Sequence, residues 1–108
     1  MPEHNPELDI QRLRDSAGQA GQLLKALANS ERLLLLCQLS QGELNVGELE
    51  SLLGITQPTL SQQLAVLRRE ELVATRRDGK QVYYRVSSPQ ALAVINTLYQ
   101  LFCAGEPT

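Results

Sequence analysis

The sequence predicts a mainly helical domain with one small β-hairpin, and three observations support this fold class. Apolar residues recur at helical spacing through most of the 108 residues. Over residues 73–86 the period changes to two, on either side of Asp78-Gly79, a dipeptide typical of hairpin turns. Helical spacing returns over residues 89–103. A chain of this length is expected to form one domain, to whose stability dimerisation would add.

Two helices are expected in the N-terminal part. Residues 1–8 contain two prolines among polar neighbours and predict a flexible arm. A helix predicted over residues 9–28 has an apolar face made of Leu13, Ala17, Ala20, Leu24 and Leu27. Asn29 or Ser30 can cap a second helix over residues 30–39, whose apolar residues cover almost every side. This second helix is therefore expected to be central and buried.

The next segment predicts two short helices, over residues 46–53 and 57–69, joined at Gly54. Each helix has one apolar stripe, formed by Val46, Leu49, Leu52 and Leu53 in the first and by Leu60, Leu64 and Leu67 in the second. Gly54 suits a left-handed helix end, Thr56 an N-cap and Pro58 a first helical turn. The pattern indicates a helix-turn-helix, in which the second helix is the recognition helix.

The face of the recognition helix opposite its apolar stripe is polar and uncharged over its first turns. Its side chains can both donate and accept hydrogen bonds, and they belong to Gln57, Thr59, Ser61, Gln62 and Gln63. Such groups suit the edges of base pairs in the major groove. Arg68 at the end of this helix, with Arg77 and Lys80 near the hairpin tip, is expected to neutralise phosphates. The hairpin taken alone is also consistent with a solvated charged turn.

The distribution of charge favours the same interpretation, although the formal net charge is −2. Residues 54–85 hold six basic and three acidic residues, a net charge of +3, whereas the remainder holds four basic and nine acidic residues, a net charge of −5. One region is therefore suited to a polyanion such as double-stranded DNA. A winged helix-turn-helix used only for protein contacts is the competing possibility.

The last predicted helix, over residues 89–103, has an apolar face wide enough to require a partner, and we expect a homodimer through the first and last helices. The chain has neither a run of eighteen apolar residues nor the basic start of a signal peptide, so we expect a cytoplasmic protein that does not enter a membrane. In a reducing cytosol, Cys37 and Cys103 are either inert core thiols or a reversible redox pair.

The segment LSQQLAVLRREELVATRRDGKQVYYRV resembles the centre of the ArsR family of winged-helix repressors, and the resemblance extends over nearly the whole chain. The family pattern is matched by Leu60, Ser61, Leu64, Leu67, Arg68, Leu72, Val73, Arg77, Gly79 and Tyr84. Gln63 is a departure, because the family usually has histidine there. The resemblance implies the order of five helices with the hairpin between the fourth and fifth, a homodimer, and an operator that is an inverted repeat.

Many members of the family sense metal ions through cysteines in the first helix of the helix-turn-helix or through acidic and histidine ligands on the last helix. Neither set is present here, and the single histidine, His4, lies on the arm. The positions of Cys37 and Cys103 are similar to those in the BigR, SqrR and HlyU subgroup, in which two thiols form a disulfide or polysulfide bridge in response to reactive sulfur or oxidants. The resemblance implies that this dithiol switches DNA affinity, with no cofactor.

Two other functions use the same residues differently. A metal-responsive ArsR repressor is one alternative. A tetrahedral zinc site needs four ligands, whereas this chain offers two thiols and one distant imidazole. A thiol-dependent peroxidase or reductase is the other, but a Cys-x-x-Cys sequence, the usual mark of such enzymes, is absent. We therefore expect a regulator and not an enzyme.

Overall fold

The computed structural model describes residues 6–103, and over this range the chain forms a winged helix-turn-helix, which confirms the predicted fold class. The elements are α1 (Pro6–Leu27), α2 (Ser30–Leu39), β1 (Leu44–Asn45), α3 (Val46–Leu53), α4 (Thr59–Arg69), β2 (Val73–Asp78), β3 (Gln81–Val86) and α5 (Pro89–Phe102). No helix in the described part combines the length and apolar character that a membrane crossing requires.

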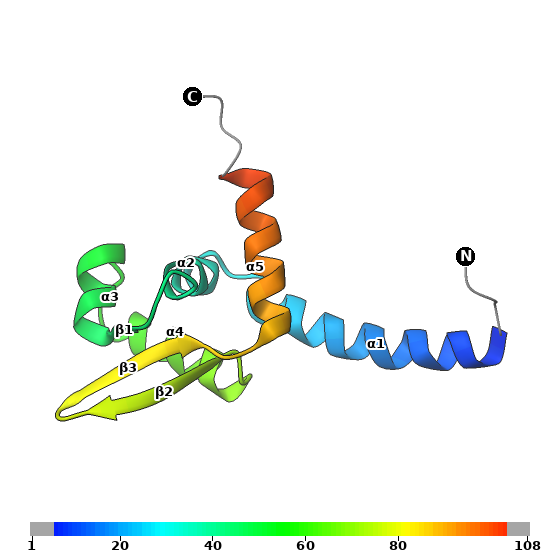
Figure 1. Ribbon diagram of the computed structural model, residues 1–108, viewed down its shortest axis with the longest axis horizontal. Coiled ribbons are helices and arrows are strands. Elements are labelled where there is room, and N and C mark those ends of the chain that lie inside the picture. The colour runs from blue at the N-terminus through cyan, green and yellow to red at the C-terminus, as the bar shows by residue number, and fades with distance from the viewer. Residues whose placement is uncertain (1–5, 104–108) are drawn as a thin grey trace.

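The helices surround α2, which lies between α3 and α5 (Figure 1). The hairpin of β2 and β3 extends from one side of this body, and α1 projects in the opposite direction with most of its length away from the other elements (Figure 1). The molecule is accordingly elongated, with extents of 53 × 38 × 22 Å. Most of α1, one of the two helices expected to contact a partner, therefore lies away from the core of its own chain, although its last turn is buried there.

The core is apolar and draws on every helix. Its fully buried large side chains are Leu35, Leu36, Leu49, Leu60, Leu64, Leu67 and Ile95. Burial of one such side chain contributes about 1.5–3 kcal/mol. On α2 and α3, two predicted apolar positions are not buried: Leu34 is 44% exposed and Leu52 is 57% exposed. Helix α3 lies at the edge of the domain and is covered on one side only, which explains Leu52, whereas Leu34 is an exposed position on the central helix α2.

Local capping explains most of the helix starts. Asn29 accepts hydrogen bonds from the backbone N–H groups of Glu31 and Arg32, both at 3.0 Å. Asn45 and Glu48 form a reciprocal capping box on α3, with both hydrogen bonds at 2.9 Å. Ser88 caps α5 with Pro89 in its first turn. Between the two helices of the helix-turn-helix, Gly54 adopts φ 70°, as its predicted role requires.

The recognition helix starts later than the sequence predicts. It begins at Thr59 and not at 57, with Pro58 and not Thr56 as N-cap residue. The physical reason is the side chain of Gln57, whose Oε1 accepts from the backbone N–H of Ser61 at 3.1 Å. This amide satisfies a free N–H of the first turn, so a hydroxyl cap is not needed.

The termini also differ from the predicted bounds. Helix α1 begins at Pro6, three residues before the predicted start, and ends at Leu27. Proline is favoured at a first helical position because its missing N–H has no partner there. The rest of the predicted arm, with His4, lies outside the described residues. At the other end, α5 stops at Phe102, and the backbone N–H of Cys103 donates to the carbonyl of Tyr99 at 2.8 Å.

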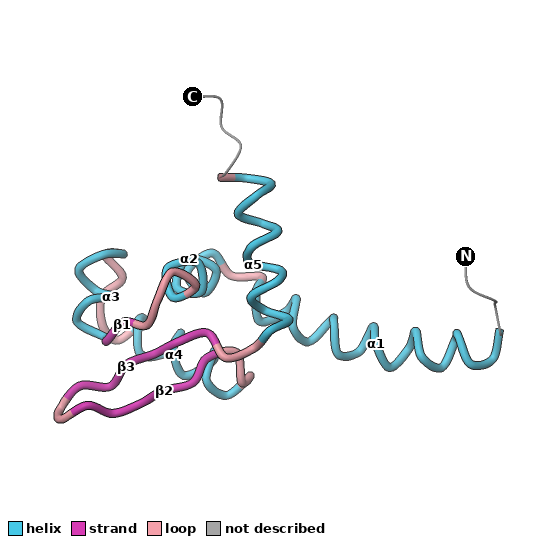
Figure 2. Tube along the Cα trace, viewed as in Figure 1, coloured by secondary structure: helices cyan, strands magenta, loops and turns pink. Residues whose placement is uncertain are grey.

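The sheet has one strand more than predicted. Strands β2 and β3 pair antiparallel with Thr75 opposite Tyr84, and β1 adds to the other edge of β3, with Leu44 also opposite Tyr84 (Figure 2). Two residues cannot display an alternating pattern, so β1 has no sequence signal. Its effect is to anchor the base of the wing beside α3.

Candidate functional site

Burial of one face of α4 determines which face it offers to a ligand. Leu60, Leu64 and Leu67 are at most 2% exposed, so the opposite side of the helix faces solvent. Gln57, Ser61 and Gln62 are exposed, and Thr59 is half-buried at the first turn. The Ser61 hydroxyl donates to Gln57 Oε1 at 2.5 Å, so these two side chains form a pre-arranged hydrogen-bonding unit. Their remaining donors and acceptors suit base edges.

Gln63, the fifth residue predicted to lie near the bases, is placed differently from the other four. Its side chain is half-buried, and its Oε1 accepts from Arg32 at 3.0 Å. Its amide nitrogen donates to Glu31 at 3.2 Å. Gln63 therefore joins the recognition helix to the start of α2.

The three cations predicted for phosphate contact are all exposed. Arg68 lies in the last turn of α4, and Arg77 and Lys80 lie at the far end of the wing hairpin. Their separation along α4 and the wing gives the protein two basic regions on different elements. Phosphate contacts of this kind position a protein on duplex DNA without reading its sequence.

Arg76 belongs to the same basic hairpin, but its guanidinium binds other residues of the protein. Its Nε donates to Glu43 at 2.6 Å, and its guanidinium lies 4.6 Å from the centroid of the Tyr83 ring. The hydrogen bond from Arg76 lowers the pKa of Glu43, and the same bond raises the pKa of Arg76. This ion pair connects the wing to the segment before α3.

Sequence reasoning missed Arg32. Its Nε donates to the carbonyl of Ala26 at 2.5 Å, in addition to its bond with Gln63. One signal was available, because a cation in the first turn of a helix opposes the helix dipole and so requires another partner. The identity of that partner depends on how α1 and α4 pack, which no local pattern reveals.

The two cysteines lie on neighbouring helices. Cys37, in the last turn of α2, is partly buried, whereas Cys103, at the end of α5, is exposed, and both are free thiols. Burial raises the pKa of the Cys37 thiol, and the nearby Cys103 raises that pKa further. The fold therefore brings together two thiols that are 66 positions apart in the sequence.

The acidic, histidine and cysteine side chains are dispersed. Within residues 6–103, no three of them gather in a way that could hold a metal ion.

The fold and this site together define the class of protein. A helix-turn-helix presents a neutral, hydrogen-bonding face on its second helix, and a cationic β-hairpin follows it in the chain. This combination is that of a winged-helix DNA-binding protein.

Comparison with known proteins then identifies the family. Residues 29–75 match the family model described as bacterial regulatory protein, arsR family. The biofilm growth-associated repressor of Agrobacterium fabrum is 49% identical over 100 residues, which cover 93% of this chain and 86% of the relative. The transcriptional activator HlyU of Vibrio cholerae is 45% identical over 99 residues, 92% of each protein. The chain belongs to the ArsR family, and it is a DNA-binding transcriptional regulator and not an enzyme.

Solved structures agree with this assignment. The transcriptional repressor BigR from Xylella fastidiosa superposes with a TM-score of 0.81 at 48% identity, covering 87% of this chain and 96% of BigR. Reduced HlyU from Vibrio cholerae gives a TM-score of 0.83 at 46% identity, covering 86% of this chain and 98% of that one. The family model and the similarity to BigR and HlyU agree with the family predicted from the recognition helix and wing.

Proposed function

We propose that this regulator is a homodimeric repressor whose affinity for an inverted-repeat operator is set by the covalent state of Cys37 and Cys103. The observation that carries the proposal is that α2 packs on α5, with Cys37 in the last turn of the first helix and Cys103 at the end of the second. Cys103 is near enough to raise the pKa of Cys37. Similarity to repressors from Agrobacterium fabrum and Xylella fastidiosa supports the repressor role.

The exposed apolar surface of α1 and α5 supports a homodimer. On these two helices the exposed large side chains are Ile10, Leu13, Leu24, Leu92, Tyr99, Leu101 and Phe102. Phe102 is 76% exposed and Leu13 is 69% exposed. Exposed large apolar side chains in this number are costly in water and typical of an interface. A two-fold partner seated there would place two copies of α4 about 34 Å apart, one turn of DNA.

On DNA, α4 and the wing have separate tasks. Gln57, Thr59, Ser61 and Gln62 meet base edges. Gln63 lies beside them on α4, near the major groove. Arg68, Arg77 and Lys80 neutralise phosphates, so binding weakens as salt rises. The inducers are oxidants or reactive sulfur species, and no cofactor takes part.

The exposed thiol reacts first. With hydrogen peroxide, the Cys103 thiolate attacks an oxygen, hydroxide leaves, and the sulfenic acid condenses with the Cys37 thiol to give a disulfide and water. With an organic persulfide, Cys103 takes the outer sulfur and releases the organic thiol. Attack of Cys37 on the resulting persulfide then forms the disulfide and releases hydrogen sulfide. If each cysteine has taken one sulfur, the same release leaves a trisulfide.

A bridge between the two cysteines would fasten α2 to the end of α5. Because α2 packs on α4 and α5 carries part of the proposed dimer surface, a small tilt of α5 changes the spacing of the two recognition helices. A coupling free energy of about 1–3 kcal/mol changes affinity about 5- to 150-fold. The bridge therefore needs no unfolding to release the operator.

The test combines mass spectrometry with DNA titration. The protein is treated with hydrogen peroxide, oxidised glutathione or an organic persulfide, and each product is identified by mass and titrated against operator DNA. We expect an internal bridge and weaker binding after at least one treatment. Cys37→Ser and Cys103→Ser should bind DNA as the unmodified protein does and lose the response. Release of DNA by treated Cys37→Ser protein would exclude the mechanism.

A further inference from the structure

We infer that Gln63 is a positioning residue, which holds the recognition helix at a defined angle to α1 through Arg32 and does not itself read a base pair. This inference rests on the proposed operator binding and changes the role of one residue within it. It depends on the hydrogen bonds made by the amide oxygen and nitrogen of Gln63. It also depends on the hydrogen bonds that Arg32 donates to backbone carbonyls of α1.

Both polar atoms of the Gln63 side chain are occupied by α2. The carbonyl oxygen accepts from the Arg32 guanidinium at 3.0 Å, and the amide nitrogen donates to the Glu31 carboxylate at 3.2 Å. Hydrogen bonds to charged partners are about twice as strong as neutral ones. Turning this half-buried amide toward DNA would break both bonds and leave two charged groups without that partner. The neighbouring Gln62 is exposed, so it can reach a base without such a loss.

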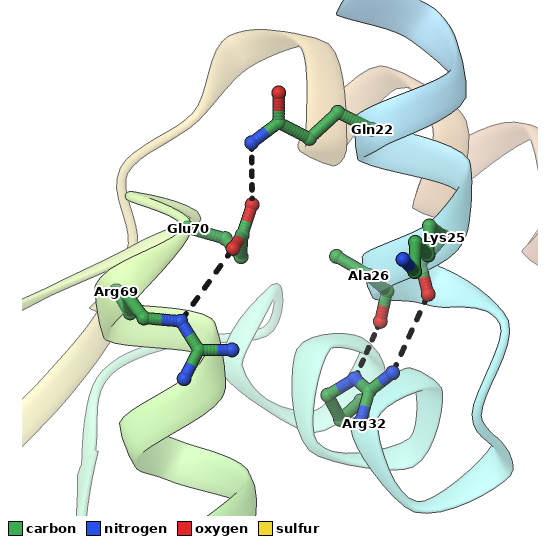
Figure 3. A network of polar contacts seen from close by, with 6 residues as sticks. All are labelled: Gln22, Lys25, Ala26, Arg32, Arg69 and Glu70. Carbon is green, nitrogen blue, oxygen red and sulfur yellow. Dashed lines mark hydrogen bonds and ion pairs between the residues drawn. The ribbon is translucent and has the colours of Figure 1, made fainter.

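Arg32 carries the connection onward to α1. Its Nε donates to the carbonyl of Ala26 at 2.5 Å, and a terminal nitrogen lies 3.4 Å from the carbonyl of Lys25 (Figure 3). Both carbonyls belong to the last turn of α1, where backbone oxygens have no helical partner and the helix dipole favours a cation. One guanidinium thus joins the C-terminal end of α1 to the recognition helix.

A second polar contact joins α1 to the residue that follows the C-terminal end of α4. The amide of Gln22 donates to Glu70 at 3.1 Å, and Glu70 also lies 3.6 Å from Arg69 (Figure 3). Arg32 links α1 to Gln63 near the middle of α4, and Gln22 links α1 to Glu70 just after its end, so rotation of α1 changes the tilt of α4. The helix proposed to meet the partner subunit is therefore mechanically joined to the helix proposed to meet DNA.

The test compares two adjacent glutamines on α4. The probe is the duplex that the wild-type protein selects from a random-sequence DNA library, together with all single base-pair substitutions of that duplex. Gln63→Leu removes both hydrogen bonds at nearly constant volume, and Gln62→Leu is the matched control on the exposed face. Arg32→Met removes the same connection from α2. Gln63→His restores an acceptor for Arg32 and a donor for Glu31.

We expect Gln63→Leu to weaken binding about 5-fold or more for every duplex while the order of preference among base pairs is unchanged. Arg32→Met should have a similar effect. The variant that carries both Gln63→Leu and Arg32→Met should bind DNA no more weakly than the weaker-binding of the two single variants, because both substitutions remove the same connection between α2 and α4. Gln63→His should bind within about 2-fold of wild type, because histidine can again accept a hydrogen bond from Arg32 and donate one to Glu31. Gln62→Leu should reduce discrimination at one base-pair position.

Two results would overturn the positioning role. One is loss of discrimination at a single base pair in Gln63→Leu, which would make Gln63 a base contact. The other is full additivity of the Gln63 and Arg32 losses, or no loss in Gln63→Leu. Failure of the wild-type protein to select any duplex would instead refute the proposed function, and this inference with it.

Discussion

The turn after the recognition helix contains a residue whose replacement by glycine should stabilise the protein. Glu71 has φ 60°, in the left-handed region where a side chain costs about 1–2 kcal/mol. Its backbone N–H donates to the carbonyl of Arg68 at 3.0 Å, and that of Leu72 to Leu67 at 2.9 Å. This is the Schellman arrangement, in which glycine is usual at the position of Glu71.

The magnitude follows from two opposing terms. Glu71→Gly relieves the left-handed strain, and it adds backbone entropy to the unfolded chain at a cost of about 0.5–1 kcal/mol. The net gain is about 0.5–1 kcal/mol, since both backbone hydrogen bonds are kept and the side chain is exposed. For a domain of this size that is a rise in melting temperature of about 2–4 °C.

The assay is thermal unfolding followed by circular dichroism at one fixed protein concentration, because the proposed dimerisation would make the melting temperature depend on concentration. Glu71→Gln is the control, since it removes the charge and keeps the Cβ atom. It should leave the melting temperature of the wild-type protein unchanged. A fall in stability for Glu71→Gly, or an equal rise for Glu71→Gln, would refute the argument from backbone conformation.

Three further predictions concern the caps, the core and the thiols. Asn45→Ala removes one half of the capping box with Glu48 and should lower the free energy of unfolding by about 1 kcal/mol in a urea titration; no change would contradict the cap. Leu60→Ala, at a position that is fully buried, should cost about 2–5 kcal/mol in the same titration, and a cost below about 1 kcal/mol would show that the site is not packed. Because burial and the nearby Cys103 raise the pKa of Cys37, its thiolate is depleted at neutral pH. Alkylation of Cys37 by iodoacetamide should therefore be slower in the folded protein than in urea. The alkylation rate of the folded protein should keep rising with pH after the rate of the unfolded protein has reached its plateau. Equal rates in the two states would refute the raised pKa.

The pKa of Cys37 also fixes the direction of one pH effect on stability. The folded protein holds the thiol proton more tightly than the unfolded chain does, because the folded pKa is the higher of the two. Its contribution to stability is complete below the unfolded pKa and is lost as the pH rises through the folded pKa. The effect therefore belongs to the alkaline range.

Much of the fold follows from local sequence. Asn29 and Ser88 cap helices at the positions where the sequence places helix starts, and Gly54 takes the positive φ that its place between two helices demands. Each of these features depends on residues within one or two turns of each other. The hairpin also follows from local sequence, but its turn consists of Gly79 and Lys80, one residue later than Asp78-Gly79 predicts, because Asp78 pairs with Gln81. Local patterns also indicated the polar face of α4, because burial of one stripe fixes the opposite one.

Contacts between distant residues were decided by the tertiary structure alone. Arg76 and Lys80 belong to one basic hairpin, yet only Arg76 is bonded to Glu43, 33 positions away. Gln63 has the same side chain as Gln62 on the same helix and is held by α2, 31 and 32 positions away. The fold also decides that Cys103 lies near enough to affect Cys37. Local periodicity gives the face on which a side chain lies, whereas its partner depends on how separate elements pack.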